Sequence, residues 1–107
     1  MFDVFMKDLN EHGGGVRAYD AVVRAARARV AGEPDNAAAL LMISYAAQHF
    51  VDAYDDQPLT ADAAAEEFQL FSSLLASLDK AYAGGASAEE KLAVLNAAAA
   101  KLVDPRS

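Results

Sequence analysis

The chain has 107 residues, of which 54% are apolar, and this composition predicts a folded domain rather than a disordered segment. It contains no cysteine, which excludes disulfide bridges, thiolate metal sites and a cysteine nucleophile. The net charge of −7 disfavours nucleic acids and anionic membranes as partners, because a protein that binds either of them needs basic residues to neutralise phosphate.

The sequence shows no targeting or membrane-spanning segment. Residues Met1 to Asp8 lack the basic start and the apolar run of a secretory signal peptide. The longest stretch without a formal charge, from Asn36 to Val51, is shorter than the roughly 20 apolar residues that span a bilayer. We therefore expect a cytoplasmic protein.

Every long segment has the periodicity of a helix, and none has the alternation of a strand. Alanine dominates the apolar fraction, and it is the best helix former. The sequence therefore predicts an all-α fold, with residues 1–107 in a single helical domain. We expect an N-terminal arm at 3–12 and a four-helix core at 16–103.

The arm is predicted to be a short helix over residues 3–11. Phe2, Phe5, Met6 and Leu9 share one face of it, and the three glycines at 13–15 end it. An apolar face on a glycine tether invites association. The arm is therefore expected to pack on the core or to exchange with a second copy, which would give a homodimer.

The second helix is predicted at 16–31, and Gly32 and Pro34 stop it. Its buried stripe consists of Val16, Tyr19, Val23, Ala26 and Val30. The third helix is expected to begin at Asp35 or Asn36, either of which can cap it, and to run to about residue 56. It is apolar on most sides, with Leu40, Leu41, Ile43, Tyr45, Ala47, Phe50 and Tyr54, which predicts a position in the middle of the fold.

The fourth helix is predicted from Thr60, as its N-cap, to about Tyr82, with an apolar stripe of Ala64, Phe68, Phe71, Leu75, Leu78 and Tyr82. Ser87 and Glu90 form a capping box for a last helix that ends near residue 103, with Leu92, Leu95, Ala99 and Leu102 inward. The short connections predict an antiparallel up-down-up-down bundle of four helices preceded by the short apolar helix. A pair of stacked helical hairpins is the alternative.

Candidate chemistry is sparse. His49 has no Glu-x-x-His partner of the kind that binds metal in helical bundles, and no serine lies in a nucleophile elbow. We therefore expect no catalytic residue, no metal ligand, no cofactor and no enzyme activity. The alternative hypothesis is a small ligand or a metal bound around His49, in a pocket lined by Tyr45, His49, Phe50, Phe68 and Phe71.

The charges are distributed unevenly. Basic residues concentrate in the second helix, where Arg17, Arg24, Arg27 and Arg29 are opposed only by Asp20. Carboxylates concentrate around the turn between the third and fourth helices, and we call this group the acidic turn: Asp52, Asp55, Asp56, Asp62, Glu66 and Glu67. The two groups can face each other or face solvent, in which case they carry no function.

The charge pattern favours a protein-binding module, such as an adaptor, a chaperone or an immunity-type inhibitor, whose partner has a basic surface. Acidic clusters steer basic partners, and arginine is enriched in interfaces. The predicted contact residues are Asp52, Asp55, Asp56, Asp62 and Glu66 at the acidic turn and Arg24 and Arg27 on the second helix.

Overall fold

The computed structural model describes residues 2–11 and 13–103, and within these ranges the ordered elements are all helices. A short N-terminal helix precedes four longer ones, which confirms the predicted fold class. The elements are α1 (Asp3–Glu11), α2 (Val16–Val30), a 3-10 turn (Pro34–Asn36), α3 (Ala37–Tyr54), α4 (Ala61–Ala83) and α5 (Ala88–Val103). None of these helices is long and apolar enough to cross a membrane.

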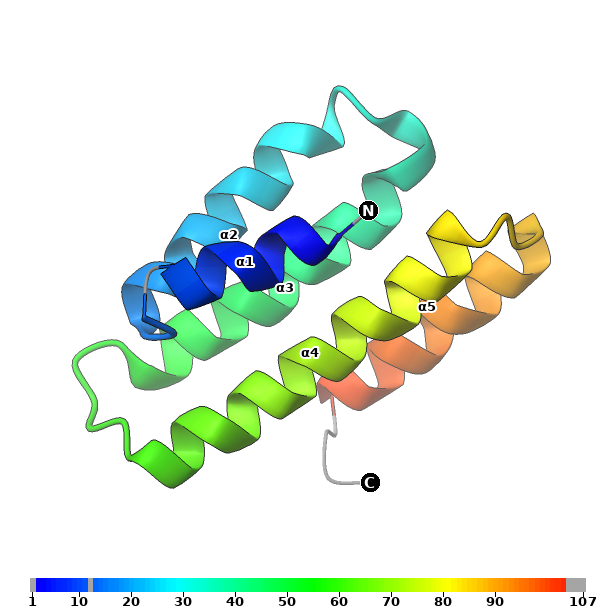
Figure 1. Ribbon diagram of the computed structural model, residues 1–107. Coiled ribbons are helices and arrows are strands. Elements are labelled where there is room, and N and C mark those ends of the chain that lie inside the picture. The colour runs from blue at the N-terminus through cyan, green and yellow to red at the C-terminus, as the bar shows by residue number, and fades with distance from the viewer. Residues whose placement is uncertain (1, 12, 104–107) are drawn as a thin grey trace.

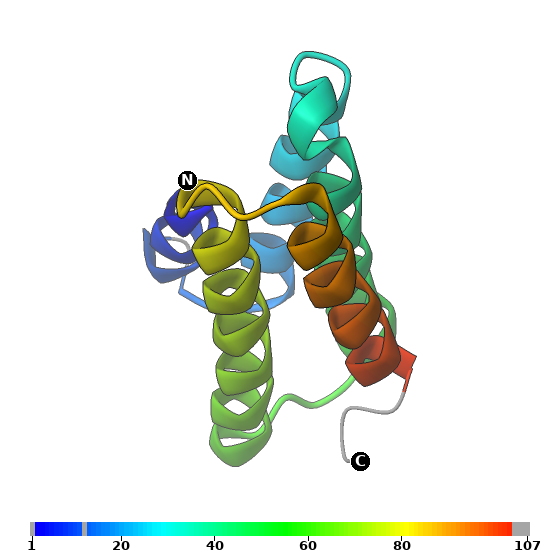
Figure 2. The same cartoon turned by 90° about the vertical axis from the view of Figure 1, so that its right-hand side faces the viewer.

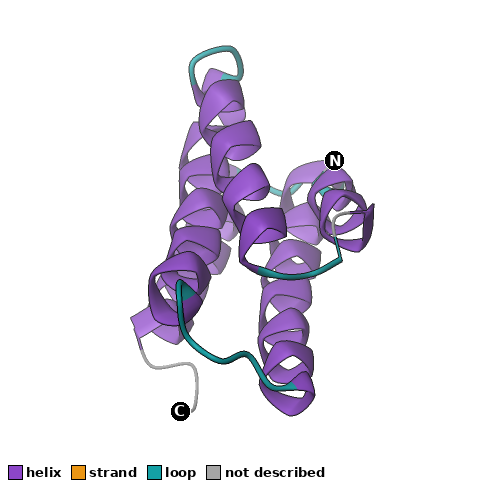
Figure 3. Cartoon of the chain, turned by 90° about the vertical axis from the view of Figure 1, so that its left-hand side faces the viewer, coloured by secondary structure: helices purple, strands orange, loops and turns teal. Residues whose placement is uncertain are grey.

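Consecutive helices run antiparallel and are joined by short loops (Figure 1). The α2–α3 hairpin is the most closely packed pair, and α4 contacts both α3 and α5. The α4–α5 hairpin lies beside the α2–α3 hairpin (Figure 2), and α1 lies against α2 and α4. Figure 3, seen from the side opposite to Figure 2, shows the loops at the ends of the helices.

The core forms where the predicted stripes of α2, α3 and α4 meet. Tyr19, Phe50 and Phe71 are all buried there, which confirms the inward face predicted for α4. The rings of Tyr19 and Phe50 stack with centroids 3.8 Å apart, and Phe71 meets Tyr19 edge-on at 5.5 Å. Aromatic pairs in these geometries contribute beyond the area that they bury.

The α1 arm is part of this core. Phe2, Phe5 and Leu9 are fully or almost fully buried, and the guanidinium of Arg29 lies 5.3 Å from the centre of the Phe5 ring. The arm therefore packs on its own chain, which is one of the two arrangements predicted for it. Exchange between two copies would reuse the same contacts, so the homodimer stays a prediction.

The helix caps agree with prediction at two of three sites. Thr60 Oγ1 accepts from the Ala63 amide at 3.1 Å, and Ser87 Oγ accepts from the Glu90 amide at 3.2 Å. At α3, Asn36 occupies the predicted N-cap position, but its side chain makes no capping hydrogen bond, and a 3-10 turn precedes the helix. The side-chain amide of Asn36 donates instead to Glu33 Oε1 at 3.1 Å.

Two expectations about apolar faces were wrong. Helix α3 contacts α2, α4 and α5, as its predicted central position requires, but Leu41 and Tyr45 are 56% and 55% exposed, so its apolar face is not buried all round. In α5 the buried residue is Ala98, whereas Leu92 is 57% exposed. Helix α5 is rich in alanine on every side, and the inward face is therefore decided by packing against α3 and α4 rather than by periodicity.

Candidate functional site

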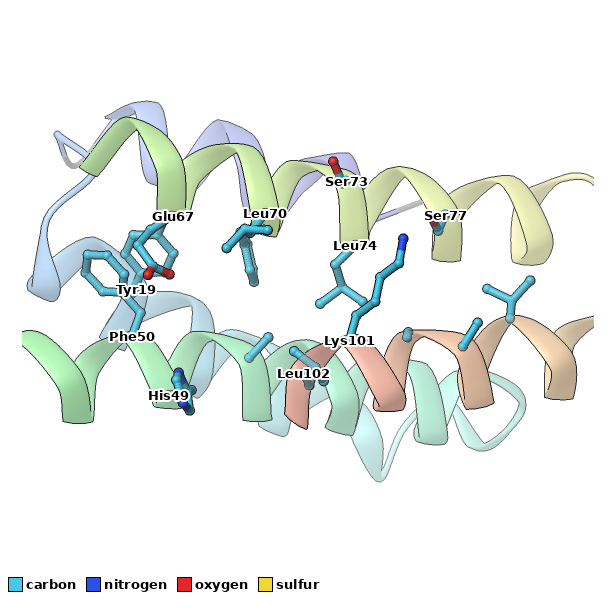
Figure 4. A pocket seen from close by; sticks show the side chains of 15 residues that line it. Tyr19, His49, Phe50, Glu67, Leu70, Ser73, Leu74, Ser77, Lys101 and Leu102 are labelled. Atoms are coloured by element: carbon cyan, nitrogen blue, oxygen red, sulfur yellow. The ribbon is translucent and has the colours of Figure 1, made fainter. Parts of the chain in front are cut away.

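A groove of about 420 Å³ lies between α3, α4 and α5, and Tyr19 of α2 contributes to one end of it (Figure 4). Pockets that hold ligands fall in the same range of volume. The lining residues are Tyr19, Ala46, His49, Phe50, Glu67, Leu70, Phe71, Ser73, Leu74, Ser77, Val94, Ala97, Ala98, Lys101 and Leu102.

The groove has apolar walls and a few separated polar groups. Leu70 and Leu74 of α4 point into it (Figure 4). Glu67 lies at the end formed by Tyr19 and Phe50, whereas the Lys101 side chain extends toward α4 farther along. The groove is therefore anionic at one end and cationic farther along.

Tyr19 is the most unusual group at this site. Its side chain is only 2% exposed, and its hydroxyl has no hydrogen-bond partner among the described residues. Burial, with a smaller contribution from the Glu67 carboxylate, raises the pKa of Tyr19 to about 12. A buried hydroxyl that has no hydrogen-bond partner destabilises the folded chain.

The structure brings together part of the predicted pocket. His49, Phe50 and Phe71 line the groove, whereas Tyr45 and Phe68 do not. The prediction that Tyr45 lines the pocket was wrong, because its side of α3 faces solvent. Phe68 packs against the core instead.

Sequence reasoning did not find several other residues of the groove. Tyr19, Lys101 and the serines of α4 come from three different helices, and only the tertiary packing brings them together. Glu67 belonged to the predicted acidic turn but not to the predicted pocket. One local signal for it existed, because Glu67 lies one helical turn before Phe71 on the same face.

The groove has no evident catalytic pair. His49 lines one wall and Ser73 and Ser77 line the other, well separated in Figure 4, and no hydrogen bond joins them. Within residues 2–11 and 13–103, no group of three His, Asp or Glu side chains lies close enough to hold a metal ion. The described residues thus offer no ligand set for the metal form of the alternative hypothesis.

The acidic turn lies at one end of the molecule, where α3 leads into α4 (Figure 1). Five of its members are exposed, and none of these five forms an ion pair with a described Lys or Arg: Asp52, Asp55, Asp56, Asp62 and Glu66. Asp52 accepts a hydrogen bond from Gln48 Nε2 at 2.8 Å. Glu67 differs from the other five, because it is half-buried at the groove.

The arginines of α2 do not neutralise the acidic turn. Arg24 pairs with Asp20 of its own helix at 3.0 Å, and Arg27 is exposed. Arg29 makes a bidentate contact with Glu33, at 2.6 and 2.9 Å. This contact, with the hydrogen bond from Asn36, lowers the pKa of Glu33 to about 2.

The acidic turn and the groove are contiguous. Glu66 lies four residues before Leu70, so both are on one side of α4. On α3, Asp52 lies three residues after His49. Carboxylates therefore flank the Glu67 end of the groove on both helices.

No protein-family model, curated protein or solved structure matches this chain.

Proposed function

We propose that this chain is a protein-binding module that accepts a basic amphipathic helix in the groove and has no catalytic activity. The observation that carries the proposal is the position of the groove directly beside the acidic turn. An amphipathic helix binds by laying its apolar face in a hydrophobic groove.

The walls of the groove suit an apolar helix face. Leu70 and Leu74 are spaced by one helical turn on α4, and Val94 and Leu102 line the facing side of α5. Leu70 is 40% exposed, so its side chain is available to a partner. Burial of such side chains against a partner contributes about 25 cal/mol per Å² of apolar surface.

The acidic turn supplies the charge preference. Its five exposed carboxylates have no described basic partner and lie close together in the chain, so they repel one another. A basic helix relieves this repulsion when it binds. The preferred partner thus has lysine or arginine beside its apolar stripe, in agreement with the basic surface predicted from the net charge.

The test uses a synthetic amphipathic helix of leucine and lysine, about 18 residues long so that it is helical, titrated against the intact chain by calorimetry. Ala97 is exposed and lines the groove, whereas Ala99 is exposed and, two residues farther along, lies on nearly the opposite side of α5. Ala97→Glu should weaken binding about tenfold, and Ala99→Glu, which changes the net charge equally, should leave it unchanged.

Two results would overturn the proposal. One is equal binding by the two glutamate variants. The other is equal binding of a scrambled peptide that has the same composition without helical spacing, because that result would mean that charge alone drives association.

A small apolar ligand in the same groove is the second candidate function, favoured by the enclosed Tyr19–Phe50–Phe71 end and by the volume of about 420 Å³. A thermal-shift screen of small metabolites distinguishes the two. A small-ligand function predicts a compact compound that raises the melting temperature in a saturable manner while the peptide does not bind.

A further inference from the structure

We infer that the Tyr19–Glu67 end of the groove is a subsite for an alkylammonium group, supplied by a lysine side chain of the bound helix. The inference rests on the proposed function for the source of the lysine. It rests on the local structure for the chemistry of the site.

The first observation is the unpaired hydroxyl. Tyr19 lines the end of the groove, and its ring is held in place by stacking on Phe50 and by the edge of Phe71. The oxygen is buried and has no partner among the described residues. A tyrosine oxygen accepts as well as donates, and an ammonium group carries three donors.

The second observation is the Glu67 carboxylate at the same end of the groove. It is near enough to Tyr19 to add to the rise in the pKa of that hydroxyl. Glu67 is half-buried, and no described Lys or Arg forms an ion pair with it. An ammonium placed between the two side chains donates to the carboxylate and to the Tyr19 oxygen, so both groups gain a partner.

The walls select an alkyl chain behind the ammonium. Phe50 and Leu70 lie on either side of Glu67 in the groove (Figure 4), and Phe71 adds apolar surface to its lining. A lysine side chain has this construction, because its methylene stem packs on apolar surface while its charge is at the tip. Lys101 lies farther along the groove and disfavours a second cation there, which restricts the ammonium to the Glu67 end.

The experiment compares n-hexylammonium, n-hexanol and hexanoate, which share one alkyl chain and differ in the head group. Binding to the whole chain is followed by NMR shifts of the Phe50, Glu67 and Phe71 amides. Hexylammonium should bind about tenfold more tightly than hexanol, and hexanoate should bind least. Glu67→Gln should abolish the preference for the amine, and Tyr19→Phe should reduce it several-fold.

Glu89→Gln is the matched control, because it removes the same charge from an exposed residue of α5 that neither lines the groove nor belongs to the acidic turn. It should leave hexylammonium affinity within about twofold, as expected of a screened surface charge. Equal loss in the Glu89 and Glu67 variants, equal binding of amine and alcohol, or no shift with any probe would each overturn the subsite. A chain that binds hexylammonium in this way but not the amphipathic peptide keeps the subsite and refutes the proposed function.

Discussion

The backbone amide of Phe2 donates to Oδ1 of Asp79 at 2.8 Å, which ties the start of the arm to α4 across 77 positions of sequence. The Phe2 ring is buried there and meets Tyr82 edge-on, with centroids 5.8 Å apart. This hydrogen bond lowers the pKa of Asp79. The arm is therefore held by a charge-assisted bond as well as by apolar burial, and it fills a place between α2 and α4 that would otherwise be open.

Deletion of residues 2–12 should destabilise the chain and promote association. The deletion uncovers apolar surface on α2 and α4 that Phe2, Phe5 and Leu9 now cover, and large exposed apolar patches associate. Thermal unfolding and light scattering of the shortened chain measure the two effects. An unchanged melting temperature and mass would show that the arm does not dock. A full-length chain that is already dimeric, and becomes monomeric on deletion, would instead indicate exchange of the arm.

Phe71→Ala should cost about 3–5 kcal/mol of unfolding free energy, because it removes a buried ring that contacts Tyr19 and leaves a cavity. Leu92→Ala is the matched control. Leu92 is 57% exposed, so its removal should change stability by less than about 0.5 kcal/mol. Denaturant unfolding of both variants checks the prediction. A larger loss for Leu92 than for Phe71 would mean that α5 buries the stripe predicted from its sequence.

Hydrophobic periodicity predicted the inward face of α4 but not that of α5. The helix bounds and the inward face of α4 followed from the sequence, because Phe71, Leu75 and Leu78 are large apolar residues at alternating spacings of four and three. In α5 the alanines give no such contrast, so the exposed position of Leu92 had no local signal. The Asn36 side chain does not cap α3, because Glu33, itself held by Arg29, takes the Asn36 amide.

The same limit applies to the site. His49, Phe50 and Phe71 could be placed near one another because they lie on consecutive antiparallel helices. Tyr19 could not be placed there, because its position on α2 reads as ordinary core. Its unpaired hydroxyl depends on which groups the other helices bring to it. The polar details of the groove are a property of tertiary packing, which hydrophobic spacing does not encode.

Glu33→Gln should flatten the loss of stability in acid. The folded-state pKa of Glu33 is about 2, below its ordinary value of 4.5, so its contribution is fully present above pH 4.5 and disappears as the pH falls toward 2. The variant should be less stable than the parent at neutral pH, and the gap should close over that window. Chemical unfolding at a series of pH values measures it. Glu89→Gln is the control variant, because it removes the same charge from an exposed position of α5.

Tyr19→Phe should have its effect in alkali. The folded-state pKa of Tyr19 is about 12 against an ordinary 10.0, so its contribution is present below pH 10 and is lost as the pH rises from 10 to 12. Below pH 10 the variant should be as stable as the parent or up to about 1 kcal/mol more stable, because an unpaired buried hydroxyl is removed. The difference in unfolding free energy in favour of the variant should grow between pH 10 and 12. Tyr45→Phe is the control variant, because it removes the same hydroxyl from a side chain that is 55% exposed.

Replacement of Asp55, Asp56 and Asp62 by asparagine should leave the fold intact, because all three side chains are exposed. Asp56 has a positive φ of 58°, a conformation that asparagine also tolerates, so the variant introduces no new strain there.

The triple variant should bind the leucine–lysine peptide with a slower association rate and a flatter dependence on salt, because exposed charges act mainly on encounter. Dissociation should change little, since the apolar contacts of the groove remain. Stopped-flow measurements at two salt concentrations separate these effects. The comparison variant replaces Arg24 and Arg27 by alanine; these residues are exposed on α2, and Arg24 pairs with Asp20. It should bind the peptide as fast as the parent or slightly faster. If this arginine variant abolishes binding while the asparagine variant associates at an unchanged rate at low salt, the interface is the exposed face of α2 and not the acidic end of the groove.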